Sequence, residues 1–411
     1  MEREAVLVAI DVGTSKVVVL IGERTADGGL NILGKGAPAS SGLKKGVVIN
    51  IEQTVGSITA AIEQAERTSG YKLEEAWVSV GGREVYSENT HGAVAVSGPR
   101  KEVGHDDIVR AMEVARAVNI PSNREILHVL PRTFIVDGQE GVHDPVGMSA
   151  VRLEIETHIV HAPATAVQNL TKCVHQAGVR IHDFVAAPLA SAEAVLSDTE
   201  KDLGVAVADM GAGTTGLALF LEGSPFHTAI LPLGGNNVTN DVAIGLKTSL
   251  EIAEDLKIRH GTCNLAAVAP EELVTVETFG DGEARTVQRA EIASIIDARM
   301  REVFEQIGEQ IERAGHGGML PAGLVLTGGA SQLAGVAELG REVLQMPVRV
   351  ATPSGVGGLT DHLLTPAFST SIGLLRWASR AIDEDPAHRY ESAPAYGGVA
   401  RLREWVRGLF P

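Results

Sequence analysis

The sequence has few cysteines, no long hydrophobic run and fewer basic than acidic side chains. Its 411 residues include two cysteines, Cys173 and Cys263, too few for a disulfide framework or a cysteine metal site, which fits a reducing cytosol. No stretch of about 18 apolar residues occurs and the N-terminal run is short and acidic, so we expect neither a membrane-spanning helix nor a signal peptide. The 52 acidic and 35 basic residues give a net charge of −17, which repels phosphate backbones, so we expect no nucleic-acid partner.

What the sequence does contain is a repeated pattern of strand, Asp-x-Gly turn and strand. Residues 7–21 read LVAIDVGTSKVVVLI and residues 205–219 read VAVADMGAGTTGLAL, so that Asp209 follows Asp11 at an offset of 198 positions. A single Asp-x-Gly between strands is usually an ordinary turn. Here each copy is followed later by a strand that ends in Gly-Gly, at residues 80–82 and 324–329. Two copies in matching context indicate a duplicated domain.

Short apolar runs alternate with segments of helical period along the rest of the chain, which is typical of a mixed α/β protein. Residues 84–161 are expected to form an inserted α+β module with a helix near 106–118. A second insertion is expected between about 232 and 300, and it includes the start of a long helix near 289–314. Residues 380–398 are polar and contain prolines and paired glycines, and they predict a flexible linker.

The two Asp-x-Gly turns predict a phosphate-binding site. Turns rich in glycine can point consecutive backbone N–H groups at a phosphate, because no Cβ keeps it away. An aspartate at the end of each strand, Asp11 and Asp209, would face the phosphates and hold Mg²⁺ through water. A lysine in the first turn would neutralise a terminal phosphate, although turn lysines are more often solvated. The predicted phosphate-binding residues are Gly13, Thr14, Ser15, Lys16, Gly211, Gly213, Thr214 and Thr215.

A nucleoside needs further contacts. The segment Thr327-Gly328-Gly329 ends a strand and precedes a helix, which offers bare backbone to a phosphate or sugar. Glu254 and Lys257 lie three apart on one helix and could reach ribose hydroxyls, although the spacing alone favours a surface ion pair. No Walker-type motif and no G-x-G-x-x-G at a strand-to-helix turn is present, so another kind of nucleotide site is expected. The predicted nucleoside-binding residues are Gly235, Glu254, Lys257, Gly328 and Gly329.

The last thirteen residues, VARLREWVRGLFP, differ in charge from the rest of the chain. They carry +2 in a chain of −17, so the remaining residues carry −19. Twelve residues of helix rise only about 18 Å, which is too short to cross a bilayer core of about 30 Å. An apolar face flanked by arginines predicts a helix lying on an anionic membrane surface, and the polar linker before it argues against docking onto the protein's own core. The predicted membrane residues are Val399, Leu402, Trp405, Val406, Leu409 and Phe410, with Arg401, Arg403 and Arg407.

The segments IDVGTSK, VADMGAGTTG, LVLTGGAS and AEDLKIRHG, in that order, resemble the actin, Hsp70 and sugar-kinase superfamily. More narrowly, the chain resembles the FtsA family of actin-like bacterial division proteins over nearly its whole length. The resemblance implies an α/β fold of duplicated actin-like, ribonuclease H-like domains around a cleft that closes on ATP, with a C-terminal amphipathic helix. It implies these regions: subdomain 1A at 1–83, 162–197 and 361–379; 1C at 84–161; 2A at 198–232 and 304–360; 2B at 233–303; a linker at 380–398; and the helix at 399–411.

The resemblance also implies partners and a location. Subdomain 2B would receive the C-terminal peptide of the tubulin-like protein FtsZ, where Arg299 matches the family's basic residue, although an ordinary arginine beside an apolar helical stripe fits equally well. The body would assemble into filaments, and subdomain 1C would serve self-association or later division proteins. The implied function is an ATP-binding scaffold that tethers the FtsZ ring to the cytoplasmic face of the cell membrane at the division site.

Catalysis is left open by the residues. Many superfamily members have Glu-Pro where this chain has Ala187-Pro188, and Glu193 aligns better with the residue that positions water in actin. Glu193 is therefore the candidate catalytic residue, although a glutamate on a helix is usually just solvated. Slow ATP turnover, or ATP as a conformational ligand, is as consistent with the sequence as efficient catalysis. Alternative functions are a sugar or acetate kinase, and an assembly ATPase of pili or microcompartments.

Overall fold

The structure, a computed structural model, describes residues 6–25, 29–98, 100–117, 120–279, 284–315 and 320–384. The predicted membrane helix at 399–411 and most of the predicted linker lie outside these residues. The first five residues of the predicted linker, 380–384, belong to a helix. Within the described ranges no helix is long and apolar enough to cross a bilayer.

The first domain is built on a six-stranded sheet with the order β11-β6-β1-β2-β3-β19. The strands β1, β2 and β3 form an antiparallel meander. The outer strands β6, β11 and β19 run parallel to the strands they pair with. The hairpin strands are buried along most of their length, which explains their continuous Val, Ile and Leu content. The strands are β1 (Val6–Val12), β2 (Val17–Arg24), β3 (Leu30–Gly36), β6 (Glu75–Val80), β11 (Arg180–Ala186) and β19 (Val356–Gly358).

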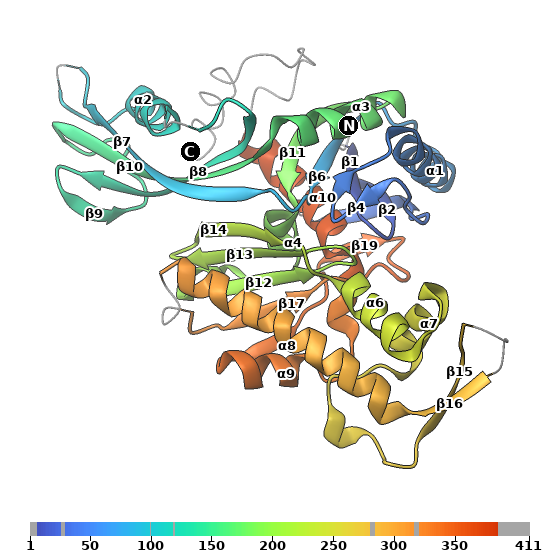
Figure 1. The fold of residues 1–411 in the computed structure, drawn as a ribbon. Coiled ribbons are helices and arrows are strands. Elements are labelled where there is room, and N and C mark those ends of the chain that lie inside the picture. The colour runs from blue at the N-terminus through green and yellow to red at the C-terminus, as the bar shows by residue number, and fades with distance from the viewer. Residues whose placement is uncertain are drawn as a thin grey trace.

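Four helices cover this sheet (Figure 1). The helix α1 begins at the residue after Asn50, whose side chain accepts from the Gln53 N–H, and it ends before Gly70 in a left-handed conformation. Close contact between α4 and α10 requires Gly373, since a Cβ there would lie 1.7 Å from the Ala190 carbonyl oxygen. The helices are α1 (Ile51–Ser69), α3 (Ala164–Gln176), α4 (Ala187–Val195) and α10 (Ser369–Glu384), and a small hairpin joins β4 (Leu43–Lys44) to β5 (Val47–Val48).

The second domain repeats the first. Its sheet has the order β14-β13-β12-β17-β18, which matches β3-β2-β1-β6-β11 strand for strand. The register is also the same, because Asp11 pairs with Val18 in one hairpin and Asp209 pairs with Gly216 in the other, each shifted by 198 positions. The predicted domain duplication is therefore confirmed. The strands are β12 (Val205–Met210), β13 (Thr215–Leu221), β14 (Ser224–Leu231), β17 (Leu324–Thr327) and β18 (Val348–Val350).

Two insertions interrupt these domains. The first insertion has its own sheet, ordered β7-β10-β8-β9, and a core in which Met112 of α2 packs with Leu153 and Ile155 of β10. Its elements are β7 (Tyr86–Ala95), α2 (His105–Arg116), β8 (Arg124–Val136), β9 (Gln139–Val142) and β10 (Arg152–Pro163). The second insertion consists of α6 (Gly235–Leu246), α7 (Leu250–His260), η1 (Leu265–Ala267), β15 (Leu273–Glu277), β16 (Ala284–Gln288) and the start of α8 (Arg289–Arg313).

The remaining short elements connect or flank the two domains. They are α5 (Asp198–Leu203), η3 (Gly329–Gln332), α9 (Val336–Leu344) and η4 (Pro366–Phe368).

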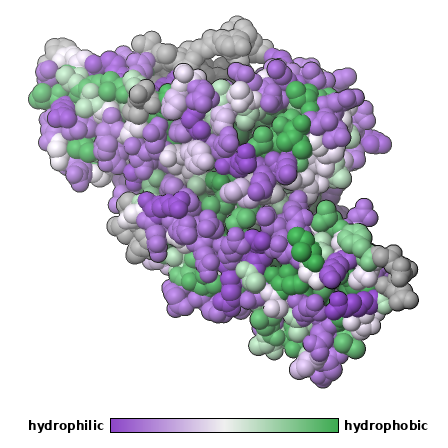
Figure 2. Space-filling model, in the orientation of Figure 1, coloured by the Kyte–Doolittle hydropathy of each residue, from purple (hydrophilic) through white to green (hydrophobic). Residues whose placement is uncertain are grey.

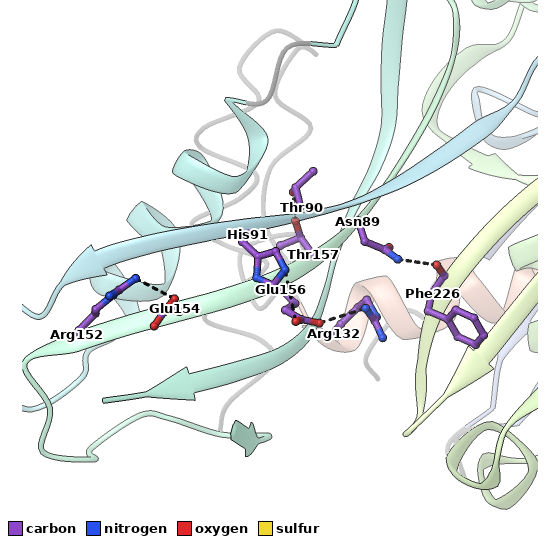
Figure 3. Close-up of polar contacts among 9 residues, drawn as sticks. All are labelled: Asn89, Thr90, His91, Arg132, Arg152, Glu154, Glu156, Thr157 and Phe226. Atoms are coloured by element: carbon purple, nitrogen blue, oxygen red, sulfur yellow. Dashed lines mark hydrogen bonds and ion pairs between the residues drawn. The ribbon is translucent and has the colours of Figure 1, made fainter. Parts of the chain in front are cut away.

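The first insertion contacts β14 of the second domain, although the chain enters and leaves the insertion through the first domain (Figures 1 and 3). Asn89 Nδ2 donates to the Phe226 carbonyl oxygen at 2.8 Å, and the Thr228 N–H donates to Ser87 Oγ at 2.8 Å. His158 bridges Asn89 Oδ1 at 2.7 Å and Thr228 Oγ1 at 2.9 Å. Because β14 is an edge strand, these side chains satisfy backbone groups that would otherwise be open.

Farther from this junction the same sheet carries ion pairs. Arg132 and His91 both contact Glu156, at 3.2 and 3.5 Å, and Arg152 contacts Glu154 at 3.0 Å (Figure 3). All of these pairs are partly exposed, so they contribute little to stability. They make the face of the first insertion polar and nearly balanced in charge.

Candidate functional site

The two Asp-x-Gly hairpins face each other across a cavity of about 540 Å³ between the domains. Most of the residues predicted to bind phosphate, metal or nucleoside line this cavity. They are Asp11, Gly13, Thr14, Ser15, Lys16, Asp209, Gly211, Gly213, Thr214, Gly235, Glu254, Lys257, Gly328 and Gly329. Thr215 does not line it, because its side chain is buried and donates to the Leu233 carbonyl oxygen at 2.9 Å.

The two turns have the same backbone geometry. The Gly13 N–H donates to the Lys16 carbonyl oxygen at 3.1 Å, and the Gly211 N–H donates to the Thr214 carbonyl oxygen at 2.9 Å. A Cβ on Gly213 would lie 2.6 Å from Thr14 Oγ1, so glycine is what lets the turns approach across the cavity. Small residues at these positions leave backbone accessible from within the cavity.

The aspartates at the two strand ends lie in this cavity with hydroxyl partners. Ser79 Oγ donates to Asp11 at 2.6 Å, while Ser191 Oγ and Thr370 Oγ1 donate to Asp209 at 2.5 and 2.6 Å. Burial raises the pKa of Asp11 to about 6, with a further contribution from the charge of Asp209. Burial also raises the pKa of Asp209, against the effect of its hydroxyl donors. Desolvated carboxylates of this kind are stabilised by a cation.

The donor set suits a hard divalent cation. Within the described ranges no cluster of three or more His, Cys, Asp or Glu side chains forms a metal centre. A cation between Asp11 and Asp209 would therefore take its other ligands from water or from a bound phosphate. Mg²⁺ is commonly held in this way, through one or two carboxylates with several waters retained.

Lys16 is not a freely solvated turn lysine. Its Nζ lies 3.7 Å from the centre of the Phe368 ring, in a cation–π contact. Burial lowers the pKa of its ammonium group, although the charges of Asp11 and Asp209 oppose this shift. Lys16 therefore places a positive charge inside the cavity beside the two carboxylates.

Glu254 and Lys257 form one wall of the cavity rather than an ordinary surface pair. Lys257 Nζ is buried and contacts Glu254 at 2.6 Å, Thr239 Oγ1 at 3.0 Å and the Gly235 carbonyl oxygen at 3.3 Å. Thr239 Oγ1 also donates to Glu254. The network fixes the start of α6 against α7 at Gly235, which lines the cavity.

Gly328 also lines the cavity, and only glycine fits there. Its φ of 83° lies in the left-handed region, and a Cβ would lie 2.3 Å from Asp209 Oδ1. The sequence prediction missed several other lining residues. Asn236 could have been inferred from its place beside Gly235, whereas Arg259, Arg289 and Gln332 carry no local signal.

The structure corrects the assignment of Glu193 as a catalytic residue. Glu193 does not line the cavity of the two hairpins and is only 8% exposed. Its carboxylate pairs with Lys201 Nζ at 2.8 Å and with Arg380 Nη2 at 2.7 Å, beside a different pocket. The two cations hold its carboxylate outside the lining of that cavity. Ala187, the residue before Pro188, does line the cavity.

Arg299 lies on α8 and outside the cavity lining. Its guanidinium pairs with Asp241, with Nη2 to Oδ1 at 3.1 Å, and with Glu302. The hydrogen bond to Asp241 is the main cause of its raised pKa. The side chain is 23% exposed, so a ligand at this place would compete with Asp241 and Glu302 for the guanidinium.

Two sheets of identical strand order, with matching hairpins on either side of a cleft, define an actin-like fold. Solved structures of this architecture are similar over most of the chain. The type IV pilus PilM–PilN complex matches with a TM-score of 0.65 and 17% identity, covering 92% of this chain and 99% of that chain. MreB5 of Spiroplasma citri bound to ADP matches with a TM-score of 0.57 and 12% identity, covering 93% of this chain and 99% of that chain. The MamK double helical filament matches with a TM-score of 0.53 and 16% identity, covering 91% of this chain and 98% of that chain.

Sequence comparison identifies the particular family. The model for cell division protein FtsA matches residues 206–373, and the model for the SHS2 domain inserted in FtsA matches residues 82–161, which is the first insertion. FtsA of Pseudomonas aeruginosa is 42% identical over 98% of both chains, that of Neisseria meningitidis 38% over 100% of both, and that of Escherichia coli K12 33% over 98% of both. The chain belongs to the FtsA family of cell division proteins.

Proposed function

We propose that this chain is an ATP-binding, actin-like scaffold that polymerises under the cytoplasmic membrane, anchors the FtsZ ring to it at the division site and recruits later division proteins. The observation that carries the proposal is the pair of hairpins with one register and one turn geometry, which face each other across the cleft. Their accessible backbone and paired aspartates suit a nucleotide with its cation.

In the proposed complex, the residues of each turn bind the phosphates and Lys16 neutralises part of their charge. Asp11 and Asp209 hold Mg²⁺ through water, which supplies further charge neutralisation. Gly235, Glu254, Lys257, Gly328 and Gly329 contact the nucleoside. The ADP bound to the similar MreB5 structure supports a nucleotide in a cleft of this fold.

ATP acts here as a conformational ligand or is hydrolysed slowly. Ala187 lies at the cavity where many superfamily members have an acidic residue, and Glu193 is paired elsewhere. The acidic residues that line the cavity in the described part of the chain are Asp11, Asp209 and Glu254, which have the proposed roles above. Efficient hydrolysis needs a base that positions water, and no further acidic residue of the lining offers one.

FtsZ binding is proposed to involve the second insertion, the proposed subdomain 2B. Self-association or the binding of later division proteins is proposed to involve the first insertion, the proposed subdomain 1C. Large apolar side chains are exposed in the second insertion, including Ile244 at 75%, Leu273 at 64% and Phe279 at 72%. Figure 2 shows hydrophobic surface gathered over the region of α7, β15 and β16. Exposed apolar patches commonly mark interaction sites. The similar MamK filament supports self-association. Arg299 is proposed to meet the FtsZ C-terminal peptide.

The membrane contact is proposed to be the helix at 399–411. Its charge of +2 attracts an anionic leaflet, while the remaining charge of −19 holds the body away from it. A single short helix is a weak anchor, so filament formation multiplies the attachment through avidity.

The test is sedimentation of the full chain with anionic vesicles, ATP and FtsZ. Recruitment of FtsZ to vesicles by this chain supports the proposal. Phosphorylation of a small substrate without recruitment would support a kinase instead. If neither recruitment nor phosphorylation is observed, an assembly ATPase of another machine is favoured.

A further inference from the structure

The partners of Asp209 cross the boundary between the domains. Asp209 lies near the end of β12 of the second domain. Thr370 lies on α10, which packs against the sheet of the first domain, and Ser191 lies on α4, which packs against α10 and contacts both sheets. Ser191 Oγ and Thr370 Oγ1 donate to the same oxygen, Oδ2, at 2.5 and 2.6 Å, and they lie 2.9 Å from each other. Ser191 is fully buried and Thr370 is 9% exposed, so water does not replace these bonds easily.

The equivalent aspartate of the first domain is held differently. Asp11 accepts from Ser79, which lies on β6 of its own sheet and also accepts from the Val12 N–H at 3.3 Å. The strand register makes Thr327 the counterpart of Ser79, because Ile10 pairs with Val78 and Ala208 pairs with Leu326. The duplicated fold would therefore lead one to expect Thr327 beside Asp209.

Thr327 instead contacts other groups. Its Oγ1 lies 2.6 Å from Ser369 Oγ, at the start of α10, and 3.2 and 3.3 Å from the carbonyl oxygens of Ala351 and Pro366. The internal symmetry of the fold is broken at this point. Asp11 is fixed within its domain, whereas Asp209 is fixed to the other domain.

The donors form a stiff pair. The backbones of α4 and α10 touch at Gly373 and Ala190, so Ser191 and Thr370 keep their separation. A rotation of the second domain relative to the first would move Asp209 away from both hydroxyls together. Hydrogen bonds to a carboxylate are short, strong and sensitive to geometry, so the bonds resist this rotation.

We propose that Ser191 and Thr370 are positioning residues that tie Asp209 to the first domain, so that a Mg²⁺–nucleotide held by Asp209 sets the angle between the domains. Oδ2 receives the two hydroxyl groups, and Oδ1 lies beside Gly328, at the wall of the cavity. A ligand in the cavity therefore acts on the Asp209 carboxylate, whose position already depends on α4 and α10. This inference rests on the proposed nucleotide site.

The test compares interdomain distances in the wild type and in the double variant Ser191→Ala/Thr370→Val. Nitroxide labels are placed at Glu63→Cys on α1 and Glu305→Cys on α8, both exposed positions, while the native cysteines are buried. Double electron–electron resonance is measured without nucleotide and with Mg²⁺–ATP. The double variant is expected to have a broader distance distribution than the wild type without nucleotide, and to lose the narrowing that Mg²⁺–ATP produces.

Two controls separate the hydroxyl bonds from general damage. Ser371→Ala removes another buried hydroxyl of α10, whose partner is the nearby Phe368 carbonyl oxygen at 3.0 Å. Thr370→Ser keeps the hydroxyl. Both are expected to match the wild type, and near-ultraviolet circular dichroism checks that each variant is folded.

The outcomes distinguish this inference from the proposed function. Wild-type distributions in the double variant, in both states, would overturn the inference. If the wild type fails to bind a fluorescent ATP analogue, the proposed function is wrong. The nucleotide-free comparison then still decides whether Ser191 and Thr370 fix the domain angle. If binding occurs and the folded Thr370→Ser variant broadens like the double variant, the hydroxyl bonds are not the cause.

Discussion

Gly213 and Thr14 belong to different domains, yet a Cβ on Gly213 would lie only 2.6 Å from Thr14 Oγ1. The two Asp-x-Gly turns can therefore approach only because position 213 has no side chain. The same threonine accepts from the Gly46 N–H at 3.2 Å, which limits its movement away from an added methyl group.

Gly213→Ala should push the turns apart and weaken ATP binding by roughly tenfold or more, about 1.4 kcal/mol. Gly56→Ala is the matched control, because a Cβ there has nothing within 4 Å and lies within α1. That control should keep ATP affinity and raise stability by about 0.5–1 kcal/mol. Titration with a fluorescent ATP analogue and urea unfolding measure the two effects. Equal affinities for wild type and Gly213→Ala would refute the close approach.

His158→Gln tests the junction between the first insertion and the second domain. Removing its two hydrogen bonds should lower the free energy of unfolding by about 1–3 kcal/mol at pH 7. Burial, together with the smaller effects of the nearby charges of His227, Arg132 and His128, lowers the pKa of His158 to about 3. Neutral His158 therefore stabilises the fold above the unfolded pKa of 6.5, and this contribution is lost as the pH falls from 6.5 toward 3.

The difference in stability between wild type and His158→Gln should accordingly shrink in acid. Urea unfolding at pH 7.0, 5.5 and 4.5 measures it. A difference that stays constant over this range would contradict the buried neutral state of the imidazole. Asn89 and Thr228 are unchanged in the variant, so the comparison isolates the ring.

Glu193→Gln separates a structural role from a catalytic one. Because Glu193 and Lys201 are both buried, removing one charge leaves the other unpaired, which should cost about 3–5 kcal/mol of stability. ATP affinity and any turnover should stay at the wild-type level. Thermal unfolding and a phosphate-release assay measure these quantities. A stable variant with abolished turnover would restore Glu193 as the catalyst.

The sequence predicted the duplicated fold and fourteen residues of the cavity lining, because both hairpins carry a local signal that repeats at a fixed offset. It did not predict the partners of the aspartates. Ser191 and Thr370 are single hydroxyls on helices 179 residues apart, and no spacing links them to Asp209. Glu193 was misplaced for a related reason, since its partner Arg380 is 187 residues away.

Lys257 shows the limit of spacing arguments in another way. The i,i+3 pairing with Glu254 is common on exposed helix faces, which is why a surface ion pair was favoured. Burial of Lys257 depends on α6 packing across α7, and this contact is tertiary. The pattern of the helix alone does not contain it.

Deleting residues 399–411 should abolish sedimentation with anionic vesicles. The triple variant Arg401→Ala/Arg403→Ala/Arg407→Ala should weaken it roughly hundredfold, since each arginine near an anionic leaflet contributes about 1 kcal/mol. Raising the salt concentration should weaken binding of the wild type more than that of the triple variant. Neutral vesicles are the control. Unchanged binding by the truncated chain would disprove the proposed anchor.

The most direct test of the central claim, that the two hairpins form one nucleotide site, is calorimetric titration with ATP in Mg²⁺ and in EDTA. The wild type is predicted to bind ATP more tightly in Mg²⁺, and Asp11→Asn and Asp209→Asn should each lose that Mg²⁺-dependent gain. Absence of ATP binding by the folded wild type, or an equal Mg²⁺ effect in all three proteins, would contradict the account.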